Sequence, residues 1–278
     1  MSLQVTNSKQ PGILKVALLQ LCAGGDKADN LSRALMMSRK AIEGGARFIL
    51  LPEVFNFRNN GRDKKLLLEA AEKIPGPSSN AFIPLAKEYK AAFLLGSIIE
   101  KDKGVRAYNT SIFIDPHGTI TAKYRKIHLF DARIDDKMIK ESDCFRAGRR
   151  PAIVKIGEFR AGLSVCYDLR FPDLYQNYAR RGVEILTVPS CFTKKTGEAH
   201  WEVLLRSRAI ENLSYVLAPN QIGIDARGIR AYGHSMIISP WGEIIARGSA
   251  EGEEIIFGDI DMDQVQKARH ALPGIVAN

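Results

Sequence analysis

Short apolar runs alternate with segments of helical periodicity along the whole chain. The first run, ILKVALLQ from Ile13 to Gln20, is typical of a buried strand, and the amphipathic segment from Asn30 to Gly44 predicts a helix behind it. A second apolar run, Phe48 to Leu51, stops at Pro52, and Glu53 follows at once. Because α/β sheets carry their active sites at strand ends, Glu53 is a candidate for chemistry.

The same alternation continues to the C-terminus. Further strands are predicted at Ala91 to Ile99, Ser111 to Ile114, Thr119 to Tyr124, Ile153 to Ile156, Phe159 to Cys166, Ile185 to Val188, Tyr215 to Asn220, Tyr232 to Ser239, Glu243 to Arg247 and Glu254 to Ile260. Helices are predicted at Asn80 to Tyr89, Pro172 to Arg181, Glu198 to Asn212 and after Asp261. Strands joined by helices in some places and by hairpins in others predict mixed sheets that are covered by helices.

The chain has no Pro/Gly/Ser-rich linker or charge block that would divide it. We therefore expect a flexible tail at residues 1–10 and one domain over residues 11–278. The first residues, MSLQVTNSKQPG, lack the features of a signal peptide, and the apolar runs are too short to cross a bilayer. The expectation is a cytoplasmic protein without membrane contact.

The formal net charge of +9 raises the question of a nucleic-acid partner. Such a partner calls for a basic stripe or arm with interleaved aromatic residues in a known module, and the sequence has neither. Short basic clusters such as Arg58 to Lys65 are interpreted as solvated loop surface or as a positive field that attracts anionic small molecules. No nucleic-acid partner is predicted.

Four scattered cysteines, Cys22, Cys144, Cys166 and Cys191, lack paired spacing and are expected to be free thiols. Cys166 closes the apolar run FRAGLSVC and so repeats the strand-end placement of Glu53. Metal-ligand spacings and glycine-rich nucleotide patterns are absent, so no metal or cofactor is predicted.

Three segments bring reactive side chains next to apolar runs: LLPE ending at Glu53, KYRKIH with Lys126, and GLSVCYDLRFPDL with Cys166. Each has an ordinary explanation on its own, as a turn residue, a surface lysine or a small core residue. Together they resemble the nitrilase superfamily of carbon–nitrogen hydrolases, and within it the Nit amidases. YNTSIFI, GEAHWEVLLRSRAIEN and YGHSMIISPWGEI extend the resemblance over nearly the whole chain.

The resemblance implies an α-β-β-α sandwich that pairs into a homodimer or higher homo-oligomer. It also implies that Glu53 is the general base, Lys126 the catalytic lysine and Cys166 the nucleophile. Glu141 is then a second glutamate that holds Lys126 and Glu53 in register. The chemistry agrees, because a thiol attacks an amide well only as thiolate, and an ammonium and a carboxylate base can supply that state. The oxyanion would be held by Lys126 and the backbone N–H of Tyr167.

Substrate-binding residues follow from the same resemblance. Arg170 is expected to grip a substrate carboxylate, and an internal salt bridge to Asp168 or Asp173 is the alternative. The pocket is further expected to have walls and closing residues from one loop. The loop from Ser190 to Trp201 offers Phe192 and Thr193 as walls and Glu198, His200 and Trp201 as closing residues. Tyr167, beside the cysteine, is expected to contact the substrate as well.

The predicted activity is hydrolysis of the terminal amide of a small carboxylated molecule, either a 2-oxo acid amide or deaminated glutathione, to an acid and ammonia. A carbamoyl hydrolase using the same residues is one alternative. A fold that has lost catalysis and serves as a binding scaffold is another, against which the intact set of Glu53, Lys126, Glu141 and Cys166 weighs.

Overall fold

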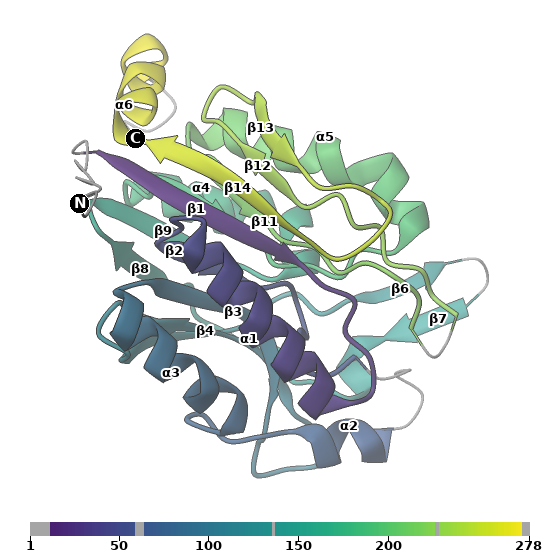
Figure 1. Cartoon of the computed structure of the whole chain (residues 1–278). Helices are drawn as coiled ribbons and strands as arrows, with labels where there is room; N and C mark the ends of the chain where they lie inside the picture. Colours follow the sequence, from purple (N-terminus) through teal and green to yellow (C-terminus); the bar gives the residue numbers. More distant parts are fainter. Residues whose placement is uncertain (1–11, 59–63, 135–136, 226–227, 274–278) are drawn as a thin grey trace, which may run out of the picture.

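Two mixed six-stranded sheets lie face to face at the centre of the molecule (Figure 1). The structure is a computed structural model and describes residues 12–58, 64–134, 137–225 and 228–273. The predicted tail at residues 1–10 lies outside this range. The first sheet has the order β14-β1-β2-β3-β4-β5, and the second has the order β13-β12-β11-β10-β9-β8.

In the first sheet, β1, β2 and β3 run parallel and the outer strands are antiparallel. Its strands are β1 (Ile13–Gln20), β2 (Phe48–Leu50), β3 (Ala92–Glu100), β4 (Tyr108–Ile114), β5 (Ile120–Arg125) and β14 (Glu254–Asp261). The second sheet has a parallel centre as well. Its strands are β8 (Ile153–Ile156), β9 (Phe159–Leu163), β10 (Ile185–Thr187), β11 (Tyr215–Ala218), β12 (Met236–Ile238) and β13 (Ile244–Arg247).

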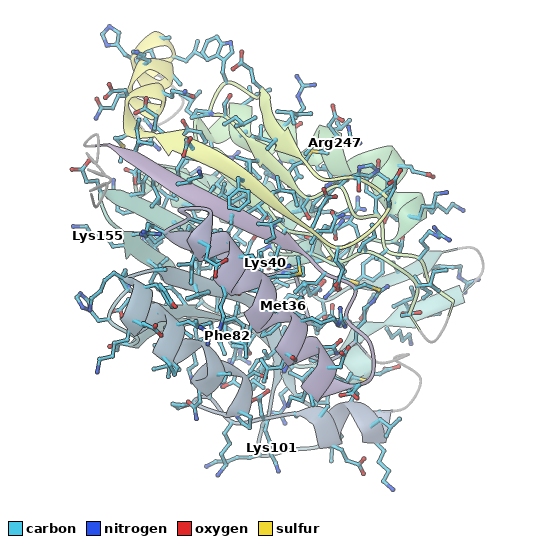
Figure 2. The ribbon with its side chains drawn as sticks, viewed as in Figure 1. Met36, Lys40, Phe82, Lys101, Lys155 and Arg247 are labelled. Carbon is cyan, nitrogen blue, oxygen red and sulfur yellow. The ribbon has the colours of Figure 1, made fainter. Side chains whose placement is uncertain are left out.

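Helices cover the outer face of each sheet, α1 and α3 on the first and α4 and α5 on the second (Figure 1). The helices are α1 (Lys27–Glu43), α2 (Lys64–Ala70), α3 (Pro77–Tyr89), α4 (Pro172–Arg180), α5 (Lys194–Asn212) and α6 (Met262–Ala271). Phe82 of α3 is fully buried, whereas Met36 and Lys40 lie on the exposed side of α1 (Figure 2).

The alternation of side chains along β1 explains the layers. Val16 and Leu18 belong to the core between the two sheets, whereas Ala17 and Leu19 belong to a second core beneath α1 and α3. Because successive strand residues point to opposite faces, a strand buried on both faces reads as a continuous apolar run. The predicted α-β-β-α arrangement is confirmed.

The loops that follow β2 and β10 come into contact at one end of the sandwich. A Cβ atom at Gly96 of β3 would lie 1.8 Å from the Leu51 carbonyl oxygen and 2.6 Å from the Pro189 side chain. Only glycine therefore lets these loops approach each other here. This contact brings the segment after β2, which carries Glu53, close to the second sheet.

Several boundaries differ from the prediction. The run Phe159 to Cys166 leaves the sheet at Leu163, and Cys166 opens a short 3₁₀ helix, η2 (Cys166–Arg170). The predicted strand from Tyr232 to Ser239 shortens to β12 because Gly233 and His234 both adopt positive φ, at 69° and 51°. A hairpin of β6 (Asp131–Ile134) and β7 (Lys137–Lys140), followed by η1 (Glu141–Asp143), was not predicted.

Candidate active site

A cavity of about 690 Å³ opens at the end of the sandwich where these loops meet. The four predicted catalytic residues, Glu53, Lys126, Glu141 and Cys166, all line it, although they come from four separate segments of the chain. The volume is within the range of pockets that bind small molecules, about 300 to 1,000 Å³. The fold thus brings the predicted reactive side chains into one site of suitable size.

Glu53 is fixed by the backbone on both sides of it. Its carbonyl oxygen accepts a hydrogen bond from Gln221 Nε2 at 2.9 Å, and the N–H of the next residue, Val54, donates to Ser97 Oγ at 2.9 Å. Val54 has φ 48°, which is costly for a β-branched residue. The surrounding contacts therefore hold a strained turn that keeps the Glu53 side chain, which is 5% exposed, in the cavity wall.

Lys126 lies between two carboxylates. Its ammonium donates to Glu53 Oε1 at 2.9 Å and to Glu141 Oε2 at 2.8 Å. The side-chain amide of Asn109 bridges the same carboxylates, donating to Glu53 Oε1 at 2.9 Å and to Glu141 Oε1 at 3.0 Å. The N–H of Phe130 adds a bond of 2.7 Å to Glu141 Oε2. This network fixes the ammonium and both carboxylates relative to one another.

The charge of Lys126 is secured by these partners. Burial alone would lower the pKa of this ammonium, which is only 2% exposed, but the charges of Glu141 and Glu53 raise the pKa well above its ordinary value. Lys126 is therefore a permanent cation at the floor of the cavity. A fixed cation in a buried site stabilises negative charge that develops during a reaction.

Cys166 is held in an unusual backbone conformation at the start of η2, with φ 50°. Its N–H donates to the Pro189 carbonyl oxygen at 2.9 Å. The fully buried Asp168 accepts the backbone N–H groups of Val165 and His128, both at 2.9 Å, and the Tyr124 hydroxyl at 2.7 Å. These bonds brace the turn that presents the cysteine to the cavity.

The thiol of Cys166 is neutral in the free protein. Burial and the negative charge of Glu53 raise the pKa of the thiol well above its ordinary value, whereas Lys126 and the N–H of Cys191 lower it by less. A thiolate must therefore form as the substrate is attacked. Both hydrogen bonds that reach the Glu53 side chain from described residues fall on Oε1, so Oε2 accepts no hydrogen bond from these residues.

Aromatic side chains form one wall of the cavity beside Cys166. The Tyr167 ring packs edge-on against Phe130, with centroids 5.0 Å apart, and against Phe171, at 5.6 Å. Phe192 is 4% exposed and packs on Trp201 at 4.7 Å. The Tyr167 N–H has no hydrogen-bond acceptor among the described residues, which leaves this donor available for an oxyanion.

Arg170 also lines the cavity, and its guanidinium lies 5.7 Å from the Tyr167 ring centre and 5.6 Å from that of Phe192. Its hydrogen-bond partner is His200 Nδ1, at 3.2 Å. Across the described ranges no carboxylate lies within salt-bridge distance of Arg170, and Asp168 is engaged by the groups that brace the cysteine turn. The alternative of an internal salt bridge to Asp168 or Asp173 is therefore wrong for this structure.

The residues predicted to close the pocket are placed differently. Thr193 lines the cavity and caps α5, but Glu198, His200 and Trp201 fall inside this helix and are not among the lining residues that the structure describes. Glu198 is an exposed partner of Lys194, at 3.5 Å. Trp201 is fully buried, and its indole N–H donates to the His234 carbonyl oxygen at 2.7 Å. These residues were expected in a loop, whereas the structure places them in α5, which begins at Lys194.

Sequence reasoning missed several residues of the site. Asn109 bridges both carboxylates, and its signal was an amide in the otherwise apolar strand segment YNTSIFI. Asp168 braces the turn that carries Cys166 and was considered only as a partner of Arg170. Met138 and Ile139 of β7 line the cavity from the hairpin that the apolar pattern did not indicate.

The structure adds two observations about classes of site. In the described part of the chain, no group of three or more His, Cys, Asp or Glu residues is arranged to hold a metal ion. None of the helices within the described ranges has the length and apolar character needed to span a membrane.

Comparison with known proteins identifies similar sequences over nearly the full length. A family model described as carbon–nitrogen hydrolase matches residues 15–270, a range that contains all four candidate catalytic residues. The human (Homo sapiens) protein named omega-amidase NIT2 is 40% identical over 260 residues, which are 93% of this chain and 92% of that protein. The mouse (Mus musculus) omega-amidase NIT2 is 37% identical over the same shares of the two chains.

Solved structures with the same arrangement include the Caenorhabditis elegans NitFhit protein, with a TM-score of 0.88 and 35% identity. That match covers 96% of this chain and 65% of the NitFhit chain. Saccharomyces cerevisiae Nit3, described as a member of branch 10 of the nitrilase superfamily, has a TM-score of 0.85 and 32% identity. That match covers 94% of this chain and 95% of the Nit3 chain.

Proposed function

The chain belongs to the carbon–nitrogen hydrolase family, and on this premise we propose that it hydrolyses the terminal carboxamide of a small, carboxylate-bearing molecule to an acid and ammonia. It is an enzyme of the nitrilase superfamily, homologous to omega-amidases. The observation that carries the proposal is one cavity in which Cys166, Glu53 and Lys126 lie together with an Arg170 that lacks a carboxylate partner among the described residues.

The reaction begins at Cys166. The thiol sulfur bonds to the carboxamide carbon as the thiol proton passes to Glu53, and the carbonyl oxygen becomes an oxyanion. Lys126 Nζ and the N–H of Tyr167 hold this oxyanion, each donor contributing about 3 kcal/mol to lowering the barrier. The neutral resting thiol supports this order of events, because the base must act during the attack.

Glu53 then returns the proton to the nitrogen, the C–N bond breaks, and ammonia leaves a thioester on Cys166. Water enters, Glu53 removes one of its protons, and the hydroxide attacks the thioester carbon. The C–S bond breaks, the carboxylic acid departs, and Glu53 gives the proton back to the thiol. Lys126 keeps its charge throughout, since its two carboxylate partners hold its pKa above the ordinary lysine value.

Arg170 selects the substrate in this proposal. A substrate carboxylate takes the position opposite the guanidinium, which Tyr167 and Phe192 hold over the cavity. The omega-amidase relatives support an omega-amide of a 2-oxo dicarboxylic acid as substrate. Deaminated glutathione presents the same 2-oxo carboxylate but a substituted amide, so that the same reaction would release cysteinylglycine in place of ammonia.

An ammonia-release screen tests the proposal. The amides are 2-oxoglutaramate, deaminated glutathione, an N-carbamoyl amino acid and the neutral amide butyramide, and product analysis separates carboxylic acid from carbon dioxide. Deaminated glutathione is followed by the 2-oxoglutarate that it yields, because its leaving group is cysteinylglycine and not ammonia. We expect the first two amides to have the highest kcat/KM. Predominant release of carbon dioxide from the carbamoyl compound would overturn the proposal in favour of a carbamoyl hydrolase.

The variant Arg170→Ala tests the selection step, with Arg180→Ala on the exposed side of α4 as the matched control. Loss of two charge-assisted hydrogen bonds should lower kcat/KM for carboxylated amides at least 100-fold and leave butyramide unaffected. An equal loss for carboxylated and neutral amides would show that Arg170 only supports the structure.

A further inference from the structure

A second cavity of about 800 Å³ lies outside the active site, at the β4–β5 edge of the first sheet. Every charged residue among its described lining is a cation: Arg106, Lys123, Arg125, Arg146, Arg149 and Arg150. Tyr108 lies among them, 3.8 Å below the Arg125 guanidinium. We name this site the arginine cleft. The sequence had suggested solvated basic clusters, but these six residues come from three separated segments.

The arginine cleft faces away from the active site. Arg125 and Lys126 are consecutive, and so are Tyr108 and Asn109. Because side chains alternate along an extended chain, the two members of each pair point to opposite sides of the sheet. Lys126 and Asn109 line the active-site cavity, whereas Arg125 and Tyr108 line the cleft. Both sites border β4 and the C-terminal end of β5, and they have no described lining residue in common.

Residues 146–150, the third segment that lines the cleft, have no regular secondary structure. Hydrogen bonds fix this segment to the residues that flank β4 and β5. The N–H of Arg146 donates to the Ala107 carbonyl oxygen and the N–H of Gly148 to that of Lys126, both at 2.8 Å. A Cβ atom at residue 148 would lie 2.0 Å from the Arg125 carbonyl oxygen, so glycine is required for this close approach. The arginines on this segment therefore stand on a fixed backbone.

Acidic neighbours neutralise only part of this charge. The buried Glu100 accepts two bonds from Arg125, at 2.7 and 2.9 Å, and lies 3.6 Å from Lys123. Asp102 pairs with Arg146 at 3.2 Å.

Three arginines of the cleft are left without such a partner. Arg106 donates to the Ser142 carbonyl oxygen, and neither Arg149 nor Arg150 has a carboxylate within salt-bridge distance among the described residues. Both Arg149 and Arg150 are exposed. Three guanidinium groups beside one cleft, on a protein of net charge +9, favour an anion of several charges.

We propose that the arginine cleft binds a small ligand that carries an oligophosphate group. Guanidinium groups bind phosphate oxygens in a bidentate manner, and the cleft presents five arginines and only one lysine. An oligophosphate carries successive charges along one chain, which matches cations that are distributed over three walls. The volume fits a small molecule.

Calorimetric titration of the full-length protein with inorganic triphosphate at 150 mM salt tests this inference. We expect one saturable site, weakened at least tenfold in the double variant Arg149→Ala/Arg150→Ala. The matched control is Arg39→Ala/Lys40→Ala, which removes two exposed charges from α1 on the far strands of the same sheet (Figure 2). This control and Arg170→Ala in the active-site cavity should both keep the affinity of the wild-type protein.

Four results would overturn the inference. They are the absence of saturable binding up to millimolar triphosphate, equal weakening in the control variant, equal affinity for citrate, and tighter binding of a short single-stranded oligonucleotide than of triphosphate. The third result would indicate a polycarboxylate site and the fourth a nucleic-acid surface. Ammonia release does not enter the measurement, so the outcome is independent of the proposed amidase activity.

Discussion

Glutamine in place of Glu141 removes one of the two negative charges beside Lys126 and keeps the size of the side chain. Glu141 Oε2 accepts from the Lys126 ammonium at 2.8 Å and from the Phe130 N–H at 2.7 Å, and Oε1 accepts from Asn109 at 3.0 Å. A glutamine has one acceptor oxygen, so it must abandon either the lysine or Asn109. Of its two carboxylate partners, Lys126 then retains only Glu53.

The distances set the scale of the effect. A charge pair at 2.8 Å attracts by about 6 kcal/mol at an effective dielectric constant of about 20. Desolvation cancels most of this attraction, and Glu53 remains at 2.9 Å, so the net loss in the free energy of unfolding should be about 2 kcal/mol. A less firmly held ammonium should lower kcat about 100-fold, because small misplacements at an active site cost this much.

The assay is ammonia release together with urea unfolding. For Glu141→Gln we expect a 100-fold lower kcat with little change in KM, because Glu141 acts through Lys126. Glu72→Gln is the matched control, since Glu72 is a buried glutamate that pairs with Lys27 at 2.8 Å and lies outside the described cavity lining. The control should lose similar stability and keep its kcat. A Glu141→Gln enzyme with kcat within threefold of wild type would refute the positioning role.

Two further predictions concern the turn and the base. In Glu53→Gln, turnover should fall by at least 1,000-fold, yet iodoacetamide should alkylate Cys166 faster at pH 8, because the lost carboxylate charge had raised the thiol pKa. In the wild type the alkylation rate should still rise above pH 9, and a rate already constant from pH 6 would contradict a neutral resting thiol. Asp168→Asn should lower the free energy of unfolding, measured in urea, by about 3 kcal/mol, because the buried carboxylate accepts two N–H groups and the Tyr124 hydroxyl. Tyr124→Phe removes one of these bonds and should cost about 1 kcal/mol. Equal stability of the two variants would refute the bracing role.

The layered fold was predictable because its strands are apolar on both faces. ILKVALLQ and FILL are nearly continuous apolar runs, which are typical of strands buried on both faces. β1 begins and ends at the predicted residues. Glu53 and Cys166 could be found because each directly follows such a run. Their closeness could not be derived from the runs themselves and came from the family resemblance.

The parts that sequence reasoning missed lack this signal. The strands of the β6–β7 hairpin, DARI and KMIK, have only four residues each, two of them charged, and KMIK does not alternate, so the pattern is too short to distinguish the hairpin from a polar loop. The positive φ of Cys166 is held by the bond of its N–H to the Pro189 carbonyl oxygen and by Asp168, which the Tyr124 hydroxyl and the His128 N–H fix from a distant segment, and no local pattern records these contacts. The arginine cleft likewise exists only because residues 146–150 cross β5.

The start of α5 shows a related limit. The helix was expected to begin at Glu198. Thr193 caps the helix instead, accepting the N–H of Thr196, and this shift turns Glu198 outward and Trp201 into the core. The closing residues implied by the family resemblance therefore lie within α5 and outside the described lining of the cavity.

The most direct test of the central claim compares Cys166→Ala with Cys191→Ala, since both thiols line the same cavity. Ammonia release from 2-oxoglutaramate is measured for each variant and for the wild type, with circular dichroism as the check on folding. We expect folded Cys166→Ala to have no detectable turnover and Cys191→Ala to stay within about tenfold of wild type. Turnover that survives in Cys166→Ala, or that disappears only in Cys191→Ala, would contradict the assignment of Cys166 as the nucleophile.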